Sequence, residues 1–153
     1  MKHLLLILIF LGNTIQIEFK KGLIRLPRNP ETPVICIGPG TGVAPMRSVI
    51  EDRLHGGSNC KFFQPIFILV PADFILLLAT FLYFGCRSAS KDQHYASEWQ
   101  SYSENQQIHY RAAFSRDGPE GEKRTYVQDL IRQDSEQIWK LVGEQKSWVL
   151  ISG

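Results

Sequence analysis

The 153-residue sequence has few cysteines, and their positions exclude several kinds of small domain. Cys36, Cys60 and Cys86 are the only ones, and no two of them form a CxxC pair. A zinc ribbon and a disulfide-stapled scaffold are therefore excluded, and so low a cysteine content suits a reducing compartment. His94 and His109 have no metal-ligand spacing, so the sequence indicates no metal site.

An excess of charge of one sign is also missing. The chain has 17 lysines and arginines against 15 aspartates and glutamates, a formal net charge of +2. This balance, without any basic stripe, gives no reason to expect a nucleic-acid partner. Hydrophobic residues make up 44% of the chain and charged residues 21%, which is typical of one globular domain with a filled core.

The sequence has no uninterrupted apolar run long enough to cross a membrane. Residues 4–11 have the layout of a signal peptide, but the run is short and no small-residue cleavage site follows. Residues 62–84 could span a bilayer by length, yet Pro65, Pro71 and Asp73 interrupt them. Membrane contact through these segments is therefore not favoured, and a short membrane or secreted protein stays as an alternative.

Strand and helix signals alternate from Pro33 onward. The predicted strands are 32–37, 81–85, 108–114 and 147–152. The first is a continuous apolar run, as expected for a parallel strand covered on both faces. Strands that alternate with helices predict an α/β fold, a parallel sheet with crossover helices.

The intervening helices are predicted from apolar spacing and capping patterns. The first begins near Pro45, ends at Gly56 and places Met46, Val49, Ile50 and Leu54 on one face. Ser90 with Gln93, and Thr125 with Gln128, form capping-box patterns. The first pattern precedes a helix with one face made of Tyr95, Ala96, Trp99 and Tyr102. The second precedes a short helix that runs through Arg132. A last helix carries Ile138, Trp139, Leu141 and Val142.

A glycine-rich loop, GPGTG, follows the first predicted strand and leads into a helix. Gly38, Gly40 and Gly42 let the backbone approach a phosphate, the helix offers free N–H groups, and Thr41 adds a hydroxyl donor. The alternative is a tight strand-to-helix turn without a ligand. A P-loop is excluded because no lysine lies between residues 21 and 61, and Val43 replaces the third glycine of a dinucleotide fingerprint.

Four motifs in order resemble one enzyme family: GPGTGVAPMR, FGCR (84–87), FSRD (114–117) and YVQ (126–128). They resemble the C-terminal NADP-binding module of ferredoxin–NADP reductase-like diflavin reductases. This family includes NADPH–cytochrome P450 reductase and the NADPH-dependent diflavin oxidoreductase of cytosolic iron–sulfur assembly. The resemblance covers residues 20–59 and 81–153 and implies a module that is incomplete at its C-terminus. The stretch 92–100 looks more like the diflavin oxidoreductase, as does Ser152, where P450 reductase has cysteine.

The resemblance implies a set of NADPH-binding residues and no catalytic residue. Thr41 corresponds to the pyrophosphate contact of the family, together with the glycine loop, and Arg87 points to the same cleft. The clamp for the 2′-phosphate corresponds to Ser115, Arg116, Arg124, Tyr126 and Gln128, and Lys123 in the longer loop 117–122 shares this role. These residue types suit the chemistry, since arginine forks bind phosphate and a tyrosine can stack on adenine.

The resemblance also implies a domain organisation and partners. Residues 1–18 form an apolar leader without a counterpart, 19–32 the tail of the FAD-binding barrel domain, and 33–153 a partial NADP-binding domain. An apolar insertion, 60–80, interrupts a pattern that would join Asn59 to Phe81. In the intact, cytoplasmic parent, hydride passes from NADPH to FAD, and electrons pass through FMN to a protein acceptor, anamorsin. The fragment alone is expected to be inactive. A P450 reductase-like fragment and a truncated isoform without enzymatic function are the alternatives.

Overall fold

The computed structural model describes residues 6–10, 13–17, 22, 24–55, 80–119, 121 and 123–153. The insertion expected at 60–80 therefore lies outside the described residues, apart from Thr80. Among the helices of the described ranges, none combines the length and the apolar character needed to cross a membrane.

The first two strands lie in the region of the predicted leader. Strands β1 (Leu6–Phe10) and β2 (Asn13–Ile17) pair antiparallel, with Leu6 opposite Ile17. They form a two-stranded sheet that is separate from the main sheet. The sequence did not predict this hairpin.

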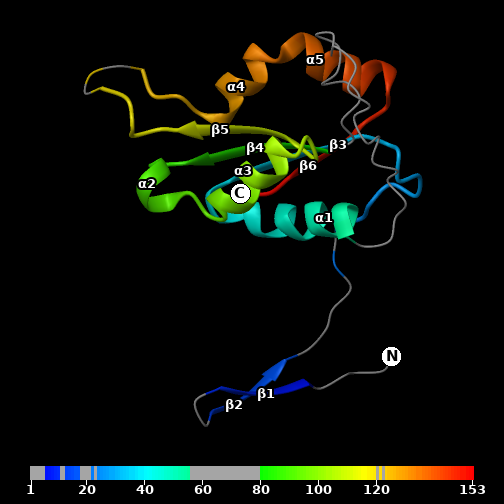
Figure 1. Ribbon diagram of the computed structural model, residues 1–153, viewed down its shortest axis with the longest axis vertical. Helices are drawn as coiled ribbons and strands as arrows, with labels where there is room; N and C mark the ends of the chain where they lie inside the picture. The colour runs from blue at the N-terminus through cyan, green and yellow to red at the C-terminus, as the bar shows by residue number, and fades with distance from the viewer. Residues whose placement is uncertain are drawn as a thin grey trace.

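The main sheet has four parallel strands, as Figure 1 shows. They are β3 (Val34–Pro39), β4 (Thr80–Cys86), β5 (His109–Phe114) and β6 (Trp148–Ile151). Their order is β5-β4-β3-β6, so the first and second strands of this sheet are central. The predicted parallel α/β fold is confirmed, and each predicted strand matches an observed one to within two residues at either end.

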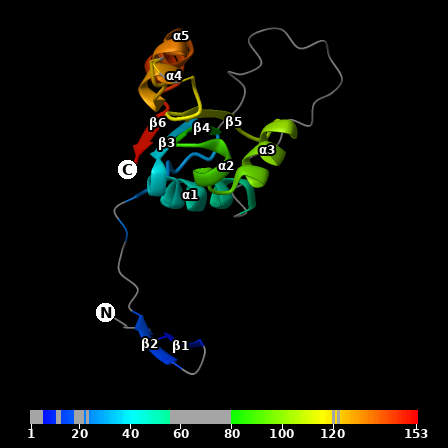
Figure 2. The same ribbon diagram turned by 90° about the vertical axis from the view of Figure 1, so that its left-hand side faces the viewer.

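Helices cover both faces of this sheet (Figure 2). One layer holds α1 (Val43–His55), the short α2 (Ala89–Asp92) and α3 (Ala96–Glu104). The opposite layer holds α4 (Val127–Gln133), α5 (Ser135–Trp139) and the π-helical turn η3 (Lys140–Glu144). A single 3₁₀ turn, η1 (Gly40–Gly42), leads directly into α1.

Two hydrophobic clusters fill the spaces between these layers because successive residues of each strand point to opposite faces. Val34 and Cys36 of β3 face α1 and α3, whereas Ile35 faces α4. Met46, Val49 and Ile50 of α1 are buried as predicted, with Leu54 half-buried. Trp99 is the largest fully buried side chain of the described residues.

Both predicted capping boxes are wrong in position. Ser90 lies inside α2, and α3 begins only at Ala96, after Tyr95 in a left-handed conformation with φ of 59°. At α4 the pattern is displaced by one residue from Thr125 and Gln128, since the Asp129 carboxylate accepts a hydrogen bond from the Tyr126 N–H at 3.0 Å. Tyr95 and Tyr126 are at the two N-cap positions, so the spacing of short polar residues does not locate either start.

A buried cation ties α1 to the sheet. Arg53 is 4% exposed, and its Nε donates to the Thr80 hydroxyl at 2.9 Å. Its Nη2 donates to the carbonyl oxygens of Pro30 and Thr32, at 3.0 and 3.1 Å. These bonds join the end of α1 to the start of β4 and to the segment before β3.

Candidate functional site

The carboxyl ends of β3, β4 and β5 meet at one edge of the sheet, and a cavity of about 480 Å³ opens there. Ligands of open parallel sheets bind at this edge, because the loops that follow the strands gather around it. The lining comes from the loop after each of these strands and from the start of α4: Pro39, Gly40, Thr41, Gly85, Cys86, Arg87, Asp92, His94, Ala113, Ser115, Thr125, Tyr126, Val127 and Gln128.

A second cavity, of about 380 Å³, adjoins the first and shares Ser115 and Thr125 with it. The loop between β5 and α4 supplies its lining: Phe114, Ser115, Arg116, Gly118, Pro119, Gly121, Lys123, Arg124 and Thr125. The two cavities together form an elongated site that runs from the glycine loop to the cations of this loop.

Most of the residues predicted from sequence lie in these two cavities. Gly40, Thr41, Arg87, Tyr126 and Gln128 line the first cavity and Arg116, Lys123 and Arg124 the second, while Ser115 lines both. Gly38 and Gly42 line neither one. Several lining residues were not predicted as site residues, notably Asp92 and His94. The stretch 92–100 indicated only a resemblance, and His94 was considered only as a metal ligand.

The glycines of the loop serve different purposes. A Cβ on Gly38 would lie 2.9 Å from the Gly42 carbonyl oxygen, and a Cβ on Gly42 would overlap the Ser152 carbonyl. These two glycines therefore let the loop pack against α1 and the end of β6. Gly40 instead has a φ of 57° and open space around its Cβ position, at the rim of the cavity. The loop is thus packed against α1 and the end of β6 on one side, and Gly40 faces the cavity on the other.

The cations of the second cavity differ in their partners. Among the described residues, neither the Arg116 nor the Arg124 guanidinium has a hydrogen-bond or ion-pair partner, and both are exposed. Lys123 Nζ lies 3.8 Å from the Asp129 carboxylate, at 86% side-chain exposure. Two guanidinium groups free of described partners are well suited to an anion of phosphate type.

Backbone hydrogen bonds hold the loops after β4 and β5 together. The Ser115 N–H donates to the Cys86 carbonyl at 3.0 Å, and the Arg116 N–H to the Arg87 carbonyl at 2.8 Å. The Asp117 carboxylate accepts from the Ala89 N–H at 2.7 Å, and this bond holds the pKa of Asp117 below its usual range. Asp117 of the FSRD motif therefore anchors the first residue of α2.

Arg87 is paired with a carboxylate in the first cavity. Its Nε and Nη2 donate to the two Asp92 oxygens at 3.1 and 3.2 Å, and this pairing raises the pKa of the guanidinium. The sequence indicated Arg87 as a cleft residue but gave no sign of Asp92, since their pairing depends on the bend between β4 and α2.

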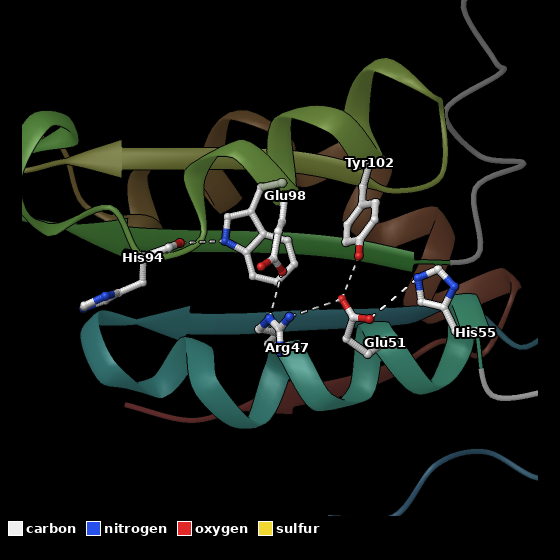
Figure 3. Close-up of polar contacts among 7 residues, drawn as sticks. Arg47, Glu51, His55, His94, Glu98 and Tyr102 are labelled. Atoms are coloured by element: carbon white, nitrogen blue, oxygen red, sulfur yellow. Dashed lines mark hydrogen bonds and ion pairs between the residues drawn. The ribbon is translucent and has the colours of Figure 1, made fainter.

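Contacts with Trp99, Tyr110 and Arg47 hold the segment between α2 and α3, and Figure 3 draws the one at His94. The Trp99 indole N–H donates to the His94 carbonyl at 2.9 Å, and Gln93 donates to the Tyr110 hydroxyl at 2.9 Å. Arg47 of α1 lies over the Tyr95 ring, 4.8 Å from its centroid. This wall of the cavity is thus supported by α1, α3 and β5.

Polar contacts between α1 and α3 complete that support. Arg47 Nε donates to the Glu98 carboxylate at 2.8 Å, and the Tyr102 hydroxyl donates to Glu51 at 2.7 Å (Figure 3). The bond to Glu51 raises the pKa of Tyr102 to about 12. His55 lies 3.6 Å from the other Glu51 oxygen. The two helices are therefore joined along their length beside the site.

The thiols near the site are poor nucleophiles. Burial raises the pKa of Cys36 to about 12 and also raises the pKa of Cys86. A protonated thiol attacks slowly, so neither cysteine favours covalent chemistry. The described residues also contain no group of three or more His, Cys, Asp or Glu side chains that could hold a metal ion.

Comparisons with known proteins identify the family of the chain. The family model for the oxidoreductase NAD-binding domain matches residues 36–153. NADPH-dependent diflavin oxidoreductase 1 from Danio rerio is 37% identical over 134 residues, 88% of this chain and 19% of the relative. The same protein from Dictyostelium discoideum is 38% identical over 147 residues, 93% and 21% of the two chains.

A second kind of relative is similar to the same degree. NADPH–cytochrome P450 reductase from Drosophila melanogaster is 37% identical over 139 residues, which are 91% of this chain and 18% of the relative. The chain spans about a fifth of the length of the curated relatives it matches.

Proposed function

Because the chain belongs to the oxidoreductase NAD-binding domain family, we propose that it binds NADPH as the nucleotide module of a diflavin reductase. The observation that carries the proposal is the pair of adjoining cavities at the carboxyl edge of the sheet, one beside the glycine loop and one beside Arg116 and Arg124. NADPH is elongated, with a diphosphate in its middle and a further phosphate at the adenosine end. The two cavities match that distribution of charge.

Each end of this site has a role in the proposal. Thr41, with the backbone of Gly40 and the start of α1, holds the diphosphate, and Gly38 and Gly42 let the loop pack closely enough to present it. Arg87 contributes a charge from the facing loop. Ser115, Arg116, Lys123 and Arg124 bind the 2′-phosphate, because their donors surround the second cavity. Tyr126 stacks on the adenine ring and Gln128 donates beside it.

The longer protein would use the bound nucleotide as a source of electrons. NADPH supplies a hydride, which we propose passes to FAD, with electrons leaving through FMN to a protein acceptor. We further propose that the longer protein is cytoplasmic and that its acceptor is the iron–sulfur assembly protein anamorsin. This chain contributes the binding and orientation of the nucleotide.

The alternative parent is a P450 reductase. Relatives of the two kinds have similar identity to this chain, 37% in each of two cases, so overall similarity does not separate them. We favour the diflavin oxidoreductase because of the stretch 92–100, which forms the wall between α2 and α3. Measuring reduction of anamorsin and of a cytochrome P450 by the full-length parent would distinguish the two.

The cofactor preference tests the proposal directly. Arg116→Ala should weaken NADPH binding by about 2 kcal/mol, roughly thirtyfold, since a charge-assisted contact to the 2′-phosphate is lost. NADH lacks this phosphate, so its affinity should stay within twofold. Isothermal calorimetry on the chain and its variants measures both.

Arg28→Ala is the matched control. Arg28 is exposed in the segment before β3 and lines neither cavity, so its loss should leave both affinities unchanged. Equal losses of affinity for NADPH and NADH in Arg116→Ala would contradict the role of Arg116 in binding the 2′-phosphate. A chain that binds neither nucleotide would contradict the proposed function itself.

A further inference from the structure

Arg87 and Asp92 form a two-point contact on the wall of the first cavity. The bonds from Nε and Nη2 use one edge of the guanidinium and both carboxylate oxygens. This geometry fixes the plane of the group as well as its position. Within the described residues Nη1 has no partner, so the outer edge of the fork is left available for a ligand.

The carboxylate stands on a segment that is itself anchored. The Asp92 N–H donates to the Ser88 carbonyl at 2.9 Å, which closes the single turn of α2. The first residue of that turn, Ala89, donates to Asp117 from the loop after β5. The Arg87 carbonyl is also held, by the Arg116 N–H. Asp92 therefore has a fixed base from which to hold a long and otherwise mobile side chain.

The exposure of the pair shows why such holding matters. The Arg87 side chain is 64% exposed, whereas Asp92 is 29% exposed. An exposed arginine has many rotamers, and ordering it at the moment of ligand binding costs conformational entropy. A partner that orders the side chain beforehand removes that cost from the binding step.

We propose that Asp92 is a positioning residue that holds Arg87 by one edge, so that its other edge meets the diphosphate of a dinucleotide. This inference rests on the proposed function and adds to it a residue that the sequence did not assign to the site. It also makes a prediction of unexpected sign. A carboxylate beside an anion site repels the ligand through space, so its removal by itself would strengthen binding. If Asp92 positions Arg87, removal of its carboxylate weakens binding instead.

The test compares two probes on the chain and its variants by calorimetry: NADP⁺, which has a diphosphate, and adenosine 2′-monophosphate, which has none. Asp92→Asn should weaken NADP⁺ binding about five- to tenfold and leave adenosine 2′-monophosphate within twofold. In an Arg87→Ala background, Asp92→Asn should cause no further loss of NADP⁺ affinity. Asp52→Asn, which removes an exposed carboxylate from α1, controls for net charge.

The outcomes separate the two proposals. NADP⁺ affinity that is unchanged or higher in Asp92→Asn would overturn positioning, and so would equal losses for the two probes, which indicate a general structural role. Should Asp92→Asn fail to fold, Arg87→Lys tests the same contact, because lysine cannot make a two-point bond. Full NADP⁺ affinity in Arg87→Lys would also overturn it. An unmodified chain that binds neither probe would refute the proposed function and the inference with it.

Discussion

Arg53 shows how a single residue can hold several segments of this fold together. Its guanidinium is buried and donates to Thr80 and to two backbone carbonyls before β3. A buried cation is stabilising only when its donors are satisfied, because otherwise the loss of hydration is not compensated. The sequence placed Arg53 in a helix but could not identify its partners, which come from two distant segments.

Removing the hydroxyl that accepts from Arg53 should destabilise the protein. Thr80→Val keeps the shape of the side chain but leaves Nε without this acceptor, and we expect a loss of about 1–3 kcal/mol. Thr32→Val is the matched control, since Thr32 contributes only its backbone carbonyl to Arg53. That variant should cost less than about 0.5 kcal/mol. Urea unfolding measures both, and equal losses would contradict this account.

At the scale of elements, the glycine loop joins β3 to α1 and also supports the end of β6. Gly42→Ala should be severely destabilising, because its Cβ would overlap the backbone of Ser152. A backbone segment cannot move aside by changing rotamer, as a side chain can. Gly40→Ala meets open space and carries only the cost of a left-handed φ, about 1 kcal/mol. In thermal unfolding, Gly42→Ala should therefore lower the midpoint temperature much more than Gly40→Ala does. The reverse order would show that the loop packs differently.

The link between α2 and the loop after β5 should depend on pH. The pKa of Asp117 is lowered from 3.8, chiefly by the hydrogen bond from Ala89. A lowered pKa in the folded state means that the bond is fully present above the unfolded pKa and is lost as pH falls through the folded one. The Ala89 amide proton should therefore shift with a midpoint below pH 3.8, observed by NMR.

Two further signals check that assignment. Asp117→Asn should abolish the step at Ala89, and the amide of Ser48, in the middle of α1, should show none in either protein. A midpoint at or above the ordinary value for aspartate, about 3.9, would mean that the bond does not stabilise the charged carboxylate.

The elements themselves could largely be predicted from the sequence, whereas their contacts could not. Apolar runs located all four strands of the main sheet. The central strands β3 and β4 are buried as such runs predict, whereas β5 is largely half-buried and β6 is mostly exposed. The start of α3 was misplaced because Tyr95 adopts a left-handed conformation that no pattern announces. The predicted face of the last helix is only partly buried, with Leu141 inside and Trp139 at 73% exposure. Pairings such as Arg87 with Asp92 depend on bends between elements, and spacing does not encode them.

At the scale of the whole molecule, the main sheet should form without residues 60–79. Helix α1 ends at His55 and β4 begins at Thr80, so the four residues 56–59 remain to connect them. Shortening a connection costs little as long as the ends can meet. We expect this deletion to keep NADP⁺ binding and to raise the soluble fraction, because the deleted sequence is mostly apolar.

A second deletion, of residues 60–80, is the matched control, since it also removes the hydroxyl of Thr80 that Arg53 uses. Its free energy of unfolding should be lower than that of the first deletion. If the shorter deletion is instead less soluble or loses nucleotide binding, the segment belongs to the working fold.

The order of strands in the main sheet has a consequence for how the protein is made. β3 is the first of these strands to be synthesised, yet its neighbour on one side, β6, is the last, with Val34 opposite Trp148. At typical rates of translation the two are separated by roughly ten seconds. During that interval one edge of β3 has no strand beside it, and such an edge pairs readily with other chains. The nascent protein is therefore most open to chaperones, and to errors of association, until β6 emerges from the ribosome.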